Sequence, residues 1–309
     1  MKRWTRALII GLAVFGSSIF GSSVLLSPVA VQAAEQDQDT FLFVLVPERN
    51  IFEQEKKYKI LCDYLCDRLS ISVEFAVLSS YEDVMKQIVD GKAQGGVMGS
   101  FLAAHTMAKH GMVPLARPEW LSGRSHYSSR VFKRAGTDLT RDVRSWKGKS
   151  IALVNRHTSA GFFFPLALLK ENGIDDPNGF FSKIVFTGSH DAPVWMVARG
   201  LTDLGAAKDS IFEETLRKRP DLKDQIEVLY SGGHFPDATF MVGPKVLPAL
   251  RDALINAFLD MDSTSDGRNV LSRFGAKRFI LSPPVDYSDV HRVVKESGFD
   301  INDMWLEDQ

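Results

Sequence analysis

The chain is poor in cysteine and nearly without net charge, and both deficits exclude classes of protein. Two cysteines are too few for a disulfide scaffold or a four-thiolate zinc site. A formal net charge of −1, from 37 basic and 38 acidic side chains, lacks the basic excess of nucleic-acid-binding domains. Hydrophobic residues at 45% and charged residues at 24% disfavour both disorder and a polytopic membrane protein. The 309 residues suggest about two ordinary domains.

Acidic side chains are missing from the first 34 residues, which have the features of an export signal. Lys2, Arg3 and Arg6 precede an apolar run over residues 7–26, and small residues follow before Glu35. A basic start, an apolar centre and a small-residue exit are typical of a secretory signal peptide.

The end of this leader leaves alternatives open. Val31 and Ala33 satisfy the preference for small residues before the cleavage point, so we expect residues 1–33 to be a cleaved signal peptide. Cleavage after Ala34 is the second choice. Retention as a membrane anchor competes with both, because the apolar run approaches the roughly 20 residues that span a bilayer. No cysteine stands directly after the leader, so we expect a free periplasmic protein rather than a lipoprotein.

Beyond the leader, short apolar runs alternate with amphipathic stretches, which is typical of α/β folds with parallel strands. The expected strands are 41–46, 73–77, 95–98, 113–116, 127–133, 150–154, 183–186, 204–207, 226–230 and 239–242. The expected helices lie near 52–69, 81–90, 101–110, 159–172, 191–200, 211–217 and 244–260.

This alternation occurs twice, which predicts two α/β lobes, each a mostly parallel sheet flanked by helices. Residues 36–130 together with 240–309 would form lobe 1, and residues 135–235 would form lobe 2. The chain would then cross between the lobes twice, and a ligand would sit in the cleft between them.

Cys62 and Cys66 lie one turn apart on the apolar face of the helix expected at 52–69. Thiols at this spacing could pair in an oxidising compartment, although helix geometry strains such a disulfide. The alternative is that both are small buried side chains.

The segment after the strand at 150–154 is the most informative. Thr158 and Ser159 precede Gly161 and an apolar helix, and either hydroxyl suits the N-cap of that helix. The first N–H groups of a helix lack internal partners and lie at the positive end of its dipole. Together with hydroxyl donors they suit a phosphate-like anion, whereas a plain helix cap is the alternative.

A second strand end carries His190, within Gly188-Ser189-His190-Asp191. This histidine could donate a hydrogen bond to an oxyanion, with Ser189 or Asp191 capping the next helix; a purely structural role is the alternative. Asp203 heads a short buried strand and could be only a turn residue.

Motifs of catalysis are missing from the chain. It has no Gly-x-Ser-x-Gly elbow, no His-Glu-x-x-His, no P-loop and no dense group of metal ligands. Although His157 or His190 could act as a base, we expect a protein that is not an enzyme and carries no cofactor or metal.

Three features occur in order: the turn from Thr158 to Pro165, Gly188-Ser189-His190-Asp191, and Gly200-x-x-Asp203 before a small-residue strand. Together they resemble the periplasmic substrate-binding proteins of phosphate, phosphite and phosphonate ABC transporters. Ser79-Ser80-Tyr81 and Val97-Met98-Gly99-Ser100 fit the first lobe of that family. The resemblance implies the type II periplasmic-binding-protein fold, with a hinge of two crossover segments.

The resemblance also implies a ligand site contributed by both lobes. The family's phosphonate-gripping Ser-Thr-Ser run falls on residues 158–160, where Ala160 lacks the third hydroxyl. A binding histidine, a first-lobe tyrosine and a loop closing from lobe 1 also have counterparts. The implied ligand-binding residues are Tyr81, Gly99, Ser100, Thr158, Ser159, Ala160, His190 and Asp237.

The departures from the family pattern concern the ligand's tail. In members that grip an aminoalkyl tail, an acid lies at the position of Ser210, which here stands beside Lys208 and Asp209. The nearest candidate for a second acid is Asp237, one place early, and a cleft tyrosine is replaced by Met98. The resemblance therefore implies an oxyanion site without a matched site for an amino group.

These observations predict a monomeric periplasmic solute-binding protein that captures a phosphate-, phosphite- or phosphonate-like oxyanion for an ABC transporter permease. The alternative is a ligand-sensing subunit that signals to a membrane receptor or histidine kinase. No nucleic-acid partner is expected. Without the +3 of the leader, the chain's −1 becomes −4, so the attraction for an anion must be local.

Overall fold

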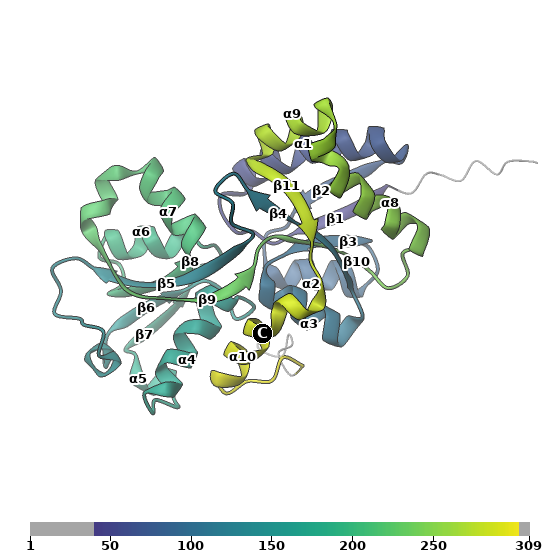
Figure 1. The fold of residues 1–309 in the computed structure, drawn as a ribbon. Coiled ribbons are helices and arrows are strands. Elements are labelled where there is room, and N and C mark those ends of the chain that lie inside the picture. Colours follow the sequence, from purple (N-terminus) through teal and green to yellow (C-terminus); the bar gives the residue numbers. More distant parts are fainter. Residues whose placement is uncertain (1–39, 303–309) are drawn as a thin grey trace, which may run out of the picture. The chain divides into compact units, whose positions relative to one another are not determined.

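The computed structural model describes residues 40–302, which fold around two β-sheets (Figure 1). The expected signal peptide, residues 1–33, lies outside this range. Between residues 40 and 302, no helix combines the length and the apolar character that crossing a membrane requires.

The first sheet has six strands in the order β11-β4-β10-β3-β1-β2. These strands are β1 (Phe41–Leu45), β2 (Val73–Val77), β3 (Gly95–Met98), β4 (Val113–Trp120), β10 (Thr239–Val242) and β11 (Ala276–Leu281). The helices that pack on it are α1 (Ile51–Leu69), α2 (Tyr81–Val89), α3 (Ser100–His110), α8 (Pro248–Leu259) and α9 (Ser265–Phe274).

The second sheet has five strands in the order β7-β6-β8-β5-β9. These strands are β5 (His126–Arg134), β6 (Ser150–Leu153), β7 (Lys183–Phe186), β8 (Leu204–Lys208) and β9 (Ile226–Pro236). The helices beside it are α4 (Phe164–Glu171), α5 (Pro177–Phe180), α6 (Ala192–Ala198) and α7 (Asp209–Lys218). Shorter turns are the π-helical turn Ser159–Phe163 and the 3₁₀ turns Val143–Trp146, Pro220–Gln225, Asp260–Ser263 and Pro284–Tyr287.

Both sheets are mixed, which corrects the expectation of mostly parallel sheets. β1 pairs in parallel with β2 and β3, and β6 pairs in parallel with β7 and β8. In contrast, β10 is antiparallel to β3 and β4, and β5 is antiparallel to β8 and β9. Parallel neighbours need a crossover within one sheet, whereas β5 and β10 enter their sheets from the other one. The two-lobed α/β architecture itself is confirmed.

The strand pattern places a separate core on each face of the first sheet. Phe43 and Leu45 of β1 point into an aromatic core beneath α1, α8 and α9, while the alternating Val44 points toward α2 and α3. The second of these cores is continuous with residues beside the second sheet, including Phe163. Apolar packing therefore extends from one sheet to the other.

The C-terminal helix α10 (Ser288–Glu296) contacts elements of both sheets, since it packs on α4 and β9 as well as on α3. β5 belongs wholly to the second sheet from His126 onward. The lobe boundaries drawn from the sequence remain predictions, and this helix adds a third passage between the sheets to the two that were expected.

Cys62 and Cys66 are both free thiols. Cys62 Sγ lies 2.6 Å from the carbonyl oxygen of Val73, and Cys66 Sγ lies 3.2 Å from the amide nitrogen of Val73. Both cysteines thus anchor α1 to the start of β2.

Candidate functional site

Polar residues that follow the carboxyl ends of parallel strands form the candidate site. Glu48 and Ser100 follow β1 and β3, Ser159 and His190 follow β6 and β7, and Lys208 ends β8. At these ends strands give way to turns and helices, whose first N–H groups lack acceptors within the helix. The site therefore follows from the topology, because both sheets contribute the carboxyl ends of their parallel strands to it.

The turn after β6 leads into a π-helical turn, Ser159–Phe163. Phe163 donates its N–H to the carbonyl of Thr158, and the N–H of Phe164 bonds to the carbonyl of Ser159. The N–H groups of residues 159–162 precede the first of these bonds, so the turn's own geometry gives them no acceptor. Such i to i+5 turns are frequent at functional sites.

Neither hydroxyl at the start of this turn acts as the expected side-chain cap. Thr158 occupies the N-cap position, but its Oγ1 donates to the carbonyl of Asn155 at 2.8 Å. The hydroxyl of Ser159 instead contacts that of Ser100, which lies beside the first sheet. The predicted N-cap position is therefore confirmed for Thr158, but its hydroxyl makes no capping bond, because Oγ1 donates to the preceding loop instead.

Gly161 is required by the close approach of this turn to β6. Val154 donates its N–H to the carbonyl of Gly161 at 3.2 Å. A Cβ on Gly161 would lie 2.4 Å from Cγ2 of Val154 and 2.9 Å from Oγ1 of Thr158. Ser129 fixes the other side of the turn by donating to the carbonyl of Ala160 at 2.7 Å.

Ser100, at the start of α3, meets this turn from the first sheet. Its Oγ lies 2.7 Å from Oγ of Ser159 and 2.7 Å from the hydroxyl of Tyr127. All three residues are buried. Gly99 precedes Ser100 as the N-cap residue and offers no side-chain bond. Two helix N-termini, one beside each sheet, thus face each other across a hydroxyl cluster.

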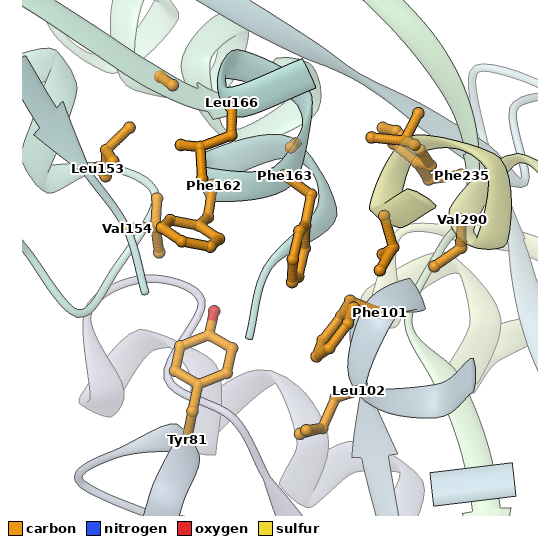
Figure 2. Packing of buried hydrophobic residues seen from close by; sticks show 14 of the residues in the cluster. Tyr81, Phe101, Leu102, Leu153, Val154, Phe162, Phe163, Leu166, Phe235 and Val290 are labelled. Atoms are coloured by element: carbon orange, nitrogen blue, oxygen red, sulfur yellow. The ribbon is translucent and has the colours of Figure 1, made fainter. Parts of the chain in front are cut away.

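Tyr81 begins α2, which Ser80 caps by accepting the N–H of Asp83 at 3.0 Å. Its side chain is buried and points toward Val154 and Phe162 (Figure 2). Burial raises the pKa of Tyr81 well above its usual value, so the phenol stays protonated as a donor.

The phenylalanine rings next to these serines pack directly on one another. Phe101 of α3 and Phe163 of the π-helical turn have ring centroids 4.4 Å apart (Figure 2). This apolar contact excludes water beside the hydroxyl cluster and strengthens electrostatic interactions there.

His190 is buried, and its ring is held in one tautomer. Nδ1 accepts the backbone N–H of Lys208 at 3.0 Å, which leaves the proton of the neutral ring on Nε2. Burial, assisted by the charge of Lys208, lowers the pKa of His190 to about 3. The imidazole is therefore neutral at pH 7 and has one N–H to donate.

Lys208 lies between two carboxylates that come from different parts of the fold. Its Nζ is 3.0 Å from Oε1 of Glu48, in the loop after β1, and 2.5 Å from Oδ1 of Asp237, between β9 and β10. Trp120 donates its Nε1–H to the other oxygen of Asp237 at 2.7 Å. Burial lowers the pKa of Lys208, but the charges of Asp237 and Glu48 outweigh it and hold the pKa above its usual value.

The Lys208 group is adjacent to the hydroxyl cluster. Lys208 Nζ lies 4.6 Å from the ring centroid of Tyr127, whose hydroxyl bonds to Ser100. Glu48, Lys208 and Asp237 line a cavity of about 430 Å³. Ser210 also lines this cavity, and its N–H donates to Asp209.

The structure therefore brings together Ser100 with Ser159, and His190 with Asp237 through Lys208. Sequence reasoning missed Glu48, Tyr127 and the role of Lys208. Glu48 and Lys208 carried a weak signal, since each is a charged residue next to the end of an apolar strand. Between residues 40 and 302, no three His, Cys, Asp or Glu side chains are placed to hold a metal ion.

Two α/β lobes with a polar site between their strand ends define a class, the two-lobed type II periplasmic binding proteins. A family model described as the periplasmic substrate-binding protein of phosphonate ABC transporters matches residues 43–287. The chain belongs to this family, whose members bind substrates for transport.

The chain is similar to a curated protein in sequence and to two solved structures in fold. The phosphate-import protein PhnD of Mycolicibacterium smegmatis is 27% identical over 245 residues, covering 73% of this chain and 75% of the relative. The structure is similar to a binding component of a Pseudomonas aeruginosa phosphonate transporter, with a TM-score of 0.77, 14% identity and coverage of 85% and 87%. It is also similar to PhnD1 of Prochlorococcus marinus in complex with methylphosphonate, with a TM-score of 0.74, 16% identity and coverage of 85% and 99%.

Proposed function

We propose that this protein captures a small phosphorus oxyanion in the periplasm, whether phosphate, phosphite or a simple phosphonate, and delivers it to an ABC permease. One observation carries the proposal: Oγ of Ser100, beside the first sheet, lies 2.7 Å from Oγ of Ser159, which begins the π-helical turn beside the second sheet. The turn itself gives the N–H groups of residues 159–162 no acceptor. Donors of this kind suit a tetrahedral oxyanion. The names of the relatives, which refer to phosphate and methylphosphonate, favour the same ligand class.

Ligand capture would follow hinge closure of the two lobes, with the bound oxyanion taking the place of direct contacts such as Ser100 to Ser159. Tyr81, Gly99 and Ser100 would act from lobe 1, and Thr158, Ser159, Ala160 and His190 from lobe 2. Each hydrogen bond to a charged ligand contributes roughly 1.5–3 kcal/mol, so four or five support micromolar or tighter binding after closure costs. We further propose that the protein is a monomer and that residues 1–33 direct its export.

Calorimetric titration of the protein with phosphate, phosphite and methylphosphonate tests this proposal. We expect at least one of the three to bind with a Kd in the micromolar range or below, and the double variant Ser159→Ala/His190→Ala to bind none of them. Ser145→Ala in the exposed turn before β6 is the control for a lost hydroxyl. Absence of binding by the wild-type protein, or unchanged affinity in the double variant, contradicts the proposal.

A further inference from the structure

The group formed by Lys208, Glu48 and Asp237 is built as a binding site for an ammonium ion. Two carboxylates from separate segments converge on one point, and Trp120 orients the second of them. Lys208 and Asp237 are 2% and 1% exposed. A buried carboxylate is stable only when it is paired and hydrogen-bonded, so this site requires a cation.

The chain supplies that cation itself. Lys208 Nζ makes hydrogen bonds to both carboxylates, at 3.0 Å to Glu48 and 2.5 Å to Asp237. An ammonium has three protons to donate, and these contacts use the acceptors that a second ammonium would need. A ligand carrying its own amino group would therefore meet two carboxylates that already accept hydrogen bonds from Lys208.

A second lysine makes the same cavity still less favourable to a cation. Lys57 lines it with its Nζ 4.1 Å from the ring centroid of Trp120 and 4.7 Å from that of Phe274. Burial and the nearby charge of Arg49 lower the pKa of Lys57 to about 8, so it remains mostly charged at pH 7. An ammonium tail entering the cavity would be repelled by this charge.

We infer that Lys208 is a specificity-determining residue, which fills the ammonium subsite of the cleft from within and so restricts the protein to oxyanions without a cationic tail. This inference rests on the proposed function, because it specifies the tail of the same ligand. Removal of the Lys208 side chain leaves Glu48 and Asp237 facing the cavity, where they can pair with the amino group of a ligand.

The test compares two phosphonates of equal size, 2-aminoethylphosphonate and n-propylphosphonate, by calorimetric titration at pH 7. For the wild-type protein we expect at least tenfold weaker binding of the amine. For Lys208→Ala we expect the ratio of the two dissociation constants to move by at least tenfold in favour of the amine. Lys208→Gln keeps a hydrogen-bond donor for the carboxylates and should move the ratio in the same direction by a smaller factor.

Lys133→Ala is the matched control. Lys133 is also a buried lysine of the second sheet, paired with Glu227 at 3.0 Å, but it lies on β5 and does not line the cavity. Its removal should leave the ratio unchanged.

The outcomes separate the inference from the proposed function. A folded wild-type protein that binds neither these ligands nor phosphate, phosphite or methylphosphonate contradicts the proposed function. A wild-type protein that binds methylphosphonate but prefers the amine overturns the inference alone. So does an unchanged ratio in a folded Lys208 variant. If neither variant folds, the wild-type ratio decides.

Discussion

The candidate site has two halves, and they differ in the charge of the buried polar groups that they hold together. On one half, Ser100, Ser159 and Tyr127 form a neutral cluster of hydroxyls between two helix N-termini. On the other half, Lys208, Glu48 and Asp237 carry full charges and sum to −1. Lys208 therefore has no positive charge to spare for an anion, because its two partners carry one more negative charge than it balances.

Under the proposed function, this difference indicates which half would attract an oxyanion. Residues 34–309 have no positive bulk field that would draw an anion, since their formal net charge is −4. Helix N-termini and hydroxyls provide donors without a counter-charge, and they leave the specificity for a tail to the charged half. Under the proposed function, binding of the oxyanion and discrimination against a cationic tail would thus depend on separate residues.

The largest expected effect comes from breaking the charged half. Lys208→Ala leaves Asp237 buried without its cation, which should lower the free energy of unfolding at pH 7 by about 3–5 kcal/mol. In the Lys133→Ala control, Glu227 is 53% exposed and regains water, so the loss should be at most about 1 kcal/mol. Urea unfolding of both variants measures the comparison. Equal losses would contradict a special cost at the cleft.

Distorting the backbone of the π-helical turn, which carries Ser159 of the neutral half, should have the next largest effect. Gly161→Ala forces a methyl group to within 2.4 Å of Val154, and we expect a loss of about 1–3 kcal/mol in unfolding free energy together with loss of oxyanion binding. Gly243→Ala, directly after β10, is the control outside the site, because a Cβ there would approach only the carbonyl oxygen of Gln94, at 3.6 Å. Thermal unfolding and titration with methylphosphonate measure both properties. A tolerated Gly161→Ala would show that the turn has room to relax.

Removing the hydroxyl of Ser159 tests the neutral half without distorting the backbone of the π-helical turn. Ser159→Ala should weaken methylphosphonate binding by roughly 10- to 150-fold, the equivalent of one charge-assisted hydrogen bond. Its unfolding free energy should change by only about 1 kcal/mol, because Ser100 keeps Tyr127 as a partner. The result opposite to this, a large loss of stability with unchanged affinity, would make the cluster structural.

Sequence patterns predicted the alternation of elements but not how the sheets are assembled. Periodicity located β1, β6 and α1 to within a residue or two, because each is a continuous apolar or amphipathic run. It placed the start of α8 four residues early, since Val246 and Leu247 continue the apolar spacing of the helix without being helical. It also could not indicate that β5 and β10 enter antiparallel, because pairing direction depends on the path between the sheets.

The same limit applies to the site. Thr158, Ser159 and His190 were found because hydroxyls and a histidine follow strands directly. Glu48 and Tyr127 were missed because their relevance arises only from contacts with residues about 160 and 27 positions away. Asp237 stays a predicted ligand residue, and the sequence did not indicate that Lys208 and Trp120 engage both its oxygens. A charge partner this distant leaves no local signal in a single sequence.

The smallest expected effect lies at the edge of the neutral half, where Glu82 of α2 joins the two sheets. Asn155 donates to its carboxylate at 2.9 Å and His157 Nδ1 lies 3.5 Å from it. The hydrogen bonds from His157 and Asn155 outweigh burial and lower the pKa of Glu82 to about 2, from an ordinary 4.5. Because the folded-state pKa is depressed, the stabilisation is complete above pH 4.5 and is lost as the pH falls toward 2.

Glu82→Gln should therefore reduce the free energy of unfolding at pH 7 by less than about 1 kcal/mol, since the carboxylate is 39% exposed and screened by solvent. The difference between wild-type and variant should shrink when urea unfolding is repeated between pH 5 and pH 3. Glu74→Gln, an exposed acid on β2, controls for the loss of one negative charge from the same sheet. If the difference in unfolding free energy stays constant over this pH range, Glu82 stabilises its contact with Asn155 and His157 by packing rather than by charge. The charge of Glu82 would then add nothing to the stability of the contact between the two sheets.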